Sequence, residues 1–98
     1  VLGLSRNNEM VSWMLLSMGG INTTVIDVRL ILQFALLTNS NAIILSHNHP
    51  SGNPKPSTAD DRVTKQVKKG CEAIDIALLD HLILTSDGYY SYTDSGRL

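Results

Sequence analysis

The chain has little of what marks several large classes of protein. Its 98 residues contain one cysteine, Cys71, which excludes an internal disulfide framework and favours a reducing, cytoplasmic compartment. The formal net charge is -1, so charge indicates neither nucleic acid nor an anionic membrane as a partner. The longest apolar runs, such as residues 30–37 with Gln33 among them, are too short to span a bilayer, and no signal peptide is visible.

What remains describes one small globular domain. The hydrophobic fraction of 43% is ordinary for such a domain, and the length suits a single compact core rather than two. The chain begins at Val1 without an initiator methionine, so we expect it to be an excised fragment of a longer protein. Residues that a functional site needs from upstream would then be missing.

Hydrophobic periodicity and turn residues predict strands and helices in mixed order. We expect a first helix capped by Asp27 and ending near Asn39, and a second helix from Ser57 to a stop at Gly70. The basic residues of the second helix are most simply a solvated face. The predicted strands are 1–5, 10–17, 42–46, 74–79, 82–85 and 89–92.

The stretch His47 to Gly52 carries the strongest functional signal. Two histidines one residue apart point to the same face of an extended chain, so their ring nitrogens can converge on one metal ion. Seven residues separate His49 from Ser57, and two more separate Ser57 from Asp60 in the first turn of the second helix. Two imidazoles and one carboxylate leave a tetrahedral zinc ion with one open position, which is typical of a hydrolytic site.

Each of these residues also has a simpler interpretation. Ser57 fits an ordinary helix N-cap as well as a donor to the oxyanion of a tetrahedral intermediate. Asp60 alone would be a first-turn charge favoured by the helix dipole. We interpret His81 as a hydrogen-bonded structural histidine rather than a ligand. The expected core residues are Cys71, Trp13 and Phe34.

Together these residues, with Pro56 and the pair Asp80-His81, resemble the RadC-like family of JAB/MPN domains. The signature of those domains is the JAMM motif: His-x-His, seven residues, Ser, two residues, Asp, and this chain matches every position. The resemblance implies an α/β domain of the MPN type, with a curved mixed sheet flanked by helices. It also implies that His47, His49 and Asp60 bind Zn²⁺, and that Ser57 supports the tetrahedral intermediate.

Active members of this superfamily are zinc peptidases or isopeptidases that also need a glutamate as general base. In RadC-like chains that glutamate is expected just before the first strand, hence upstream of Val1 here; neither Glu9 nor Glu72 occupies its place. We therefore expect a zinc metallopeptidase domain, a hydrolase acting on a peptide or isopeptide substrate through metal-activated water. The alternative is a non-catalytic metal-binding or partner-binding module of a DNA-repair or mobile-element protein. A nuclease or deaminase that uses the same zinc is the third possibility. Exposed edge strands could pair to form a dimer, so the sequence leaves the oligomeric state open.

Overall fold

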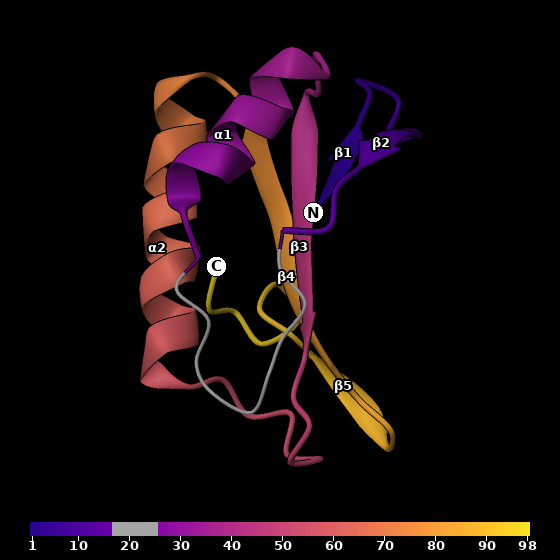
Figure 1. The fold of residues 1–98 in the computed structure, drawn as a ribbon, viewed down its shortest axis with the longest axis vertical. Coiled ribbons are helices and arrows are strands. Elements are labelled where there is room, and N and C mark those ends of the chain that lie inside the picture. Colours follow the sequence, from indigo (N-terminus) through magenta and orange to yellow (C-terminus); the bar gives the residue numbers. More distant parts are fainter. Residues whose placement is uncertain (17–25) are drawn as a thin grey trace.

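The computed structural model describes residues 1–16 and 26–98. Within them the chain forms seven elements: two strands, then a helix, a strand and a second helix, and finally two more strands (Figure 1). The last residue of the predicted strand 10–17 lies outside these residues, and within them the strand ends at Trp13, earlier than predicted. The elements are β1 (Leu2–Leu4), β2 (Met10–Trp13), α1 (Val28–Leu37), β3 (Ala42–Asn48), α2 (Thr58–Ala73), β4 (Ala77–Thr85) and β5 (Gly88–Ser91).

The five strands form one mixed sheet in the order β2-β1-β3-β4-β5. The central strands β3 and β4 run parallel, because α2 carries the chain back between them, and the other neighbours are antiparallel. A single compact domain with a mixed sheet and two helices confirms the predicted α/β fold of the JAB type.

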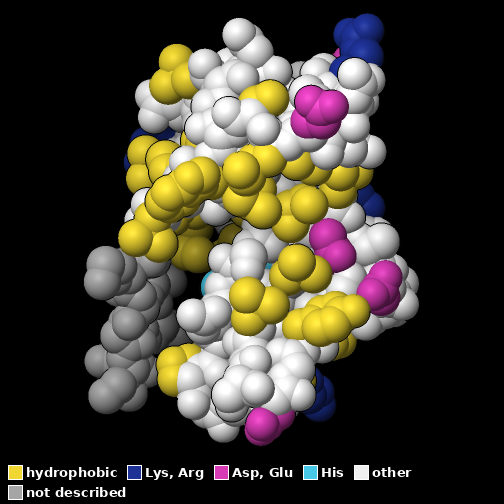
Figure 2. All heavy atoms as spheres, turned by 90° about the vertical axis from the view of Figure 1, so that its right-hand side faces the viewer, with side chains coloured by type: hydrophobic (Ala, Val, Ile, Leu, Met, Phe, Trp, Pro, Cys, Tyr) yellow, Lys and Arg dark blue, Asp and Glu magenta, His cyan; other side chains and the backbone are white. Residues whose placement is uncertain are grey.

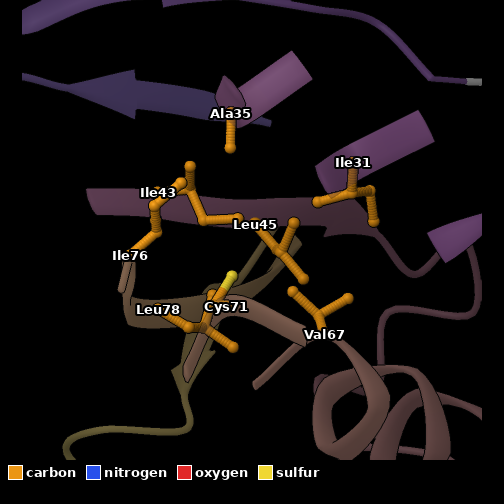
Figure 3. Packing of buried hydrophobic residues seen from close by; sticks show 8 residues of the cluster. All are labelled: Ile31, Ala35, Ile43, Leu45, Val67, Cys71, Ile76 and Leu78. Atoms are coloured by element: carbon orange, nitrogen blue, oxygen red, sulfur yellow. The ribbon is translucent and has the colours of Figure 1, made fainter. Parts of the chain in front are cut away.

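Both helices pack against the same side of the sheet, seen at the left of Figure 1. Ile43 and Leu45 alternate along β3 and reach the same core, where they meet side chains of both helices and of β4 (Figure 3). Full burial of one such aliphatic side chain stabilises the fold by about 1.5–3 kcal/mol. The remaining members of this cluster are Ile31, Ala35, Val67, Cys71, Ile76 and Leu78.

Gly70 does not end the second helix, contrary to the prediction, because α2 continues to Ala73. A Cβ placed on Gly70 would lie 2.6 Å from a methyl carbon of Leu32 in α1. The glycine therefore permits the close approach of α1 and α2 rather than a C-terminal cap. The chain turns only afterwards, where Asp75 takes a left-handed conformation with φ of 59°.

Three other predictions need correction. The strand predicted at 42–46 extends to Asn48, because His47 and Asn48 pair with Ile83 and Leu84 of β4. The strands predicted at 74–79 and 82–85 are one continuous strand, β4, which begins only at Ala77 and passes through Asp80 and His81. Trp13 is 66% exposed on the edge strand β2 and so is not a core residue, whereas Phe34 and Cys71 are buried as predicted.

The side of the molecule that faces right in Figure 1 carries a band of hydrophobic side chains (Figure 2). Edge strand β2 contributes exposed apolar residues to the surface, including Met10 and Val11, and the hairpin of β4 and β5 contributes Leu84 and Tyr89. Neither helix of the described residues combines the length and hydropathy needed to cross a bilayer.

Candidate metal centre

The end of β3 delivers both histidines of the motif to one place. His47 is still part of the strand, opposite Ile83, and the backbone N–H of His49 donates to the carbonyl of Leu84 at 3.0 Å. Extended backbone therefore persists to His49, and the two side chains fall on the same face as predicted. The ring of His49 is held by its Nδ1, which lies 3.0 Å from the carbonyl oxygen of Asn53. Because a carbonyl only accepts, Nδ1 carries the hydrogen and Nε2 keeps its lone pair.

The start of α2 delivers the carboxylate. Ser57 is the N-cap, its hydroxyl oxygen accepts from the backbone N–H of Asp60 at 3.0 Å, and its own N–H donates to Asp60 Oδ2 at 2.8 Å. This reciprocal pair is a capping box, with aspartate in place of the usual glutamate, and it confirms Ser57 as the helix N-cap. It fixes both the beginning of the helix and the direction of the Asp60 side chain.

The three predicted ligand residues meet at a small triangle of atoms. His47 Nε2 lies 3.0 Å from His49 Nε2 and 3.1 Å from Asp60 Oδ1, and His49 Nε2 lies 3.0 Å from Asp60 Oδ2. Nitrogen and oxygen ligands bound to a tetrahedral zinc at about 2.0–2.1 Å are separated by about 3.3 Å. A small outward shift of each side chain thus suffices to admit an ion, and the donor set of two imidazoles and one carboxylate suits zinc.

Local electrostatics keep His47 and Asp60 in the protonation state that a cation requires. Burial lowers the pKa of His47, a shift that the neighbouring Asp60 only partly opposes. Burial alone would raise the pKa of Asp60, but the hydrogen bonds from Ser57 and the nearby histidines outweigh it and lower the pKa. At neutral pH the site therefore holds a neutral His47 beside an ionised carboxylate.

His81 is buried and hydrogen-bonded, as predicted for a structural histidine, with 4% of its surface exposed. It lies outside the group of His47, His49 and Asp60 that could hold a metal ion. Its Nε2 is 2.9 Å from His47 Nδ1, a contact that the sequence analysis missed. The only sequence signal was the position of His81 beside Asp80 between two predicted strands, and nothing local indicated the pairing of β4 with β3.

Ser57 is engaged in the capping box through both its hydroxyl oxygen and its backbone N–H. The amide that could have served as an oxyanion donor already binds Asp60. The hydroxyl proton is not used by the capping box, since the oxygen acts there as acceptor. A role of Ser57 in supporting a tetrahedral intermediate stays a prediction.

Neither glutamate of the chain lies near the site, as expected. Glu9 is in the turn between β1 and β2, at the end of the sheet where Leu4 pairs with Ala42, roughly 17 Å from His47 by strand rise. Glu72 is twelve residues beyond Asp60 along α2, about 18 Å away by helix rise.

A mixed sheet with two histidines at the end of a central strand and an aspartate at the start of the following helix defines a JAB-type domain. The sequence model of the family described as RadC-like JAB domain matches residues 1–97, and this chain belongs to that family. It is 46% identical to a UPF0758 protein of Flavobacterium johnsoniae over 98% of this chain and 42% of the relative. It is 39% identical to a UPF0758 protein of Aquifex aeolicus, over 99% and 42% respectively. The chain spans less than half the length of these relatives.

Proposed function

We propose that this domain forms the metal site of a zinc-dependent hydrolase that cleaves peptide or isopeptide bonds. The convergence of two imidazole nitrogens and a carboxylate within 4.8 Å of one another, in a domain of the RadC-like JAB family, is the observation that carries the proposal. When bound, zinc would supply Lewis acidity and lower the pKa of a water molecule to ~7.

The chain's own residues would perform three tasks. His47 and His49 would hold the metal through neutral Nε2 atoms, and Asp60 would provide the negative charge. The capping box would keep the Asp60 carboxylate ionised and fixed in direction. The free hydroxyl proton of Ser57 would donate to the carbonyl oxygen of a substrate as negative charge develops there.

A general base is the part that this chain lacks near the metal centre, and the register of β1 indicates where it would enter. Leu2 lies opposite Ile44 and Leu4 opposite Ala42 in antiparallel pairing, so the backbone that leads into β1 comes from the His47 end of β3. A glutamate carried by a stretch before Val1 would therefore lie beside the metal ligands. We propose that the general base lies in that stretch. We also propose that the domain works in the cytoplasm, where the thiol of buried Cys71 remains reduced.

The test compares hydrolysis by the full-length protein and by its Asp60→Ala variant, each supplied with zinc. The substrates are a mixture of quenched fluorescent peptides and a reporter joined through a lysine isopeptide bond. Asp75→Asn is the matched control, because it removes the same charge from an exposed residue outside the site. Cleavage that Asp60→Ala and a chelator abolish, and that Asp75→Asn retains, supports the proposal. Cleavage that survives Asp60→Ala contradicts it.

A non-catalytic module of a DNA-repair or mobile-element protein is the second candidate. The distance of both glutamates from the metal centre favours it, because without a base the site would bind metal and support a partner-binding surface. A full-length protein that binds one zinc ion yet cleaves neither kind of reporter would favour this alternative. Binding to duplex DNA that weakens steeply with salt would add a nucleic-acid partner.

A further inference from the structure

Two buried polar side chains lie behind the ligand His47. His81, on the neighbouring strand β4, has its Nε2 2.9 Å from His47 Nδ1. Thr64, on α2, has its hydroxyl oxygen 2.5 Å from the other ring nitrogen of His81. Both side chains are 4% exposed, so water does not compete for these contacts.

The direction of each of these hydrogen bonds can be worked out from the one that Thr64 makes. Thr64 Oγ1 lies 2.8 Å from the carbonyl oxygen of Asp60, which can only accept, so the hydroxyl proton of Thr64 is used there. The hydroxyl oxygen must then accept from His81 Nδ1–H. In a neutral imidazole the other nitrogen is an acceptor, so His81 Nε2 accepts from His47 Nδ1–H.

This order leaves only one tautomer for His47. With its hydrogen on Nδ1, the lone pair of Nε2 points toward His49 Nε2 and Asp60 Oδ1, where the metal ion would lie. In this tautomer His47 Nε2, His49 Nε2 and the Asp60 carboxylate are all acceptors 3.0–3.1 Å apart, an arrangement that a cation between them would stabilise. The opposite tautomer would place a hydrogen at the metal position and leave His47 Nδ1 and His81 Nε2 as two acceptors facing each other behind the ring. His49 reaches the same tautomer through the backbone carbonyl of Asn53, whereas His47 depends on side chains.

The support behind His47 is itself held in place. The ring of Tyr92 stacks on His81 with centroids 5.0 Å apart and an interplanar angle of 7°. The Tyr92 hydroxyl donates to Asp61 Oδ1 at 2.7 Å, and Arg97 donates to the other oxygen of that carboxylate at 2.7 Å. The segment after β5 is thus fastened to α2 and fixes the plane of the His81 ring.

We propose that His81 and Thr64 are positioning residues that select the tautomer and orientation of His47 for metal binding. The proposal rests on the proposed metal-binding function of the site. Outer partners of metal-binding histidines commonly change metal affinity ten- to a hundredfold when removed. Asp60 joins the two layers, because its carboxylate faces the metal position while its carbonyl oxygen ends the hydrogen-bond chain.

The first readout is the tautomer of His47 in metal-free protein, measured by ¹H–¹⁵N correlation of the histidine rings at pH 8, above their ordinary pKa. Wild type should show hydrogen on Nδ1 of His47. In His81→Leu the acceptor is gone, and we expect a mixture of both tautomers. In His81→Gln the side-chain amide oxygen can accept from His47, and we expect Nδ1–H to persist. Thr64→Val removes only the far hydroxyl, and serves if His81→Leu does not fold.

The second readout is zinc and cobalt affinity, at folding matched by circular dichroism. We expect His81→Leu to weaken binding ten- to a hundredfold, Thr64→Val by about fivefold, and His81→Gln by less than about threefold. Unchanged affinity and an unchanged His47 tautomer in folded His81→Leu or Thr64→Val would overturn the proposal. A wild type that binds no metal but shows His47 Nδ1–H would overturn the proposed function while leaving the assigned hydrogen-bond order intact.

Discussion

The two ends of strand β3 are built for different tasks. At its first residues, Ala42 and Ile43 are buried, and β1 approaches so closely that a Cβ on Gly3 would overlap the hydroxyl of Ser40. At its last residues the strand carries polar side chains, and His47 keeps 27% of its side chain exposed. The seven residues of β3 thus pass from a closed apolar layer to an open group of atoms that could bind a metal ion.

This contrast separates stability from function along a single strand. The apolar end should control whether the domain folds, while the polar end should control whether it binds metal. Because the strand is continuous and parallel to β4, folding of the first end sets the geometry of the second. Variants at the apolar end should therefore lose stability, and variants at the polar end should lose metal affinity. Measuring both properties in each variant shows how far stability and metal binding are separated along the strand.

The largest effect is expected from Asp60→Ala, at the polar end. If zinc binding of ~10 kcal/mol is shared among three protein ligands, losing one removes about 3.3 kcal/mol and should weaken affinity by about three-hundredfold. The helix should survive, with a loss of about 1 kcal/mol in the free energy of unfolding for the broken capping box. Competition with a chromophoric chelator measures the affinity, and Asp75→Asn is the control. A folded Asp60→Ala protein that retains wild-type affinity would be incompatible with the site.

Ile43→Ala tests the apolar end. Ile43 is fully buried, and removing its side chain should leave a cavity and lower the free energy of unfolding by about 2–5 kcal/mol. Urea denaturation measures this loss. The fraction that stays folded should still bind one equivalent of zinc with nearly unchanged affinity. A large loss of affinity in the folded fraction would show that the two ends are not separable.

Acid should destabilise the metal-free domain through its buried histidine. Burial lowers the pKa of His81 from 6.5 to about 4, and burial lowers the pKa of His47 as well. Between these pH values the unfolded chain binds more protons than the folded one, so stability falls as pH drops from 6.5 toward 4. For His81 the total loss is about 3 kcal/mol. Urea denaturation in chelator across this range measures it, and a similar slope in His81→Gln would argue against His81 as the source.

The smallest effect is expected from Ser57→Ala. Loss of the N-cap should lower the free energy of unfolding by about 1 kcal/mol, while the backbone N–H still donates to Asp60. Metal affinity should change by less than about tenfold. If Ser57 also supports the tetrahedral intermediate of the proposed hydrolysis, kcat of the full-length protein should fall with little change in KM. Ser57→Thr, which retains a capping hydroxyl, should recover the stability.

The sequence predicted the parts of the site that depend on short spacing. His47 and His49 share a face because they are two residues apart in extended chain, and Asp60 follows from a capping box that Ser57 begins. These are local rules. The order of strands and helices was also predictable, since hydrophobic periodicity reflects which face each element buries. The mixed sheet was expected only from the resemblance to the RadC-like family.

The parts that could not be predicted depend on contacts between distant residues. Asp80 and His81 look like an interruption of a strand, but their polar atoms find partners on other elements: Ser91 donates to Asp80, and His81 contacts Thr64. Gly70 looked like a helix stop because its contact with Leu32 of α1 is invisible in local sequence. Trp13 was predicted to be buried from its residue type, yet it lies on an edge strand.

Metal content of the purified domain is the most direct test of the central claim that His47, His49 and Asp60 form one metal site. Wild type and a His47→Ala, His49→Ala double variant, both purified without chelator, supplied with zinc and desalted, would be compared by elemental analysis at matched folding. The account predicts about one zinc ion per chain in wild type and none in the double variant. A folded wild type without zinc, or a double variant that keeps it, would contradict the account.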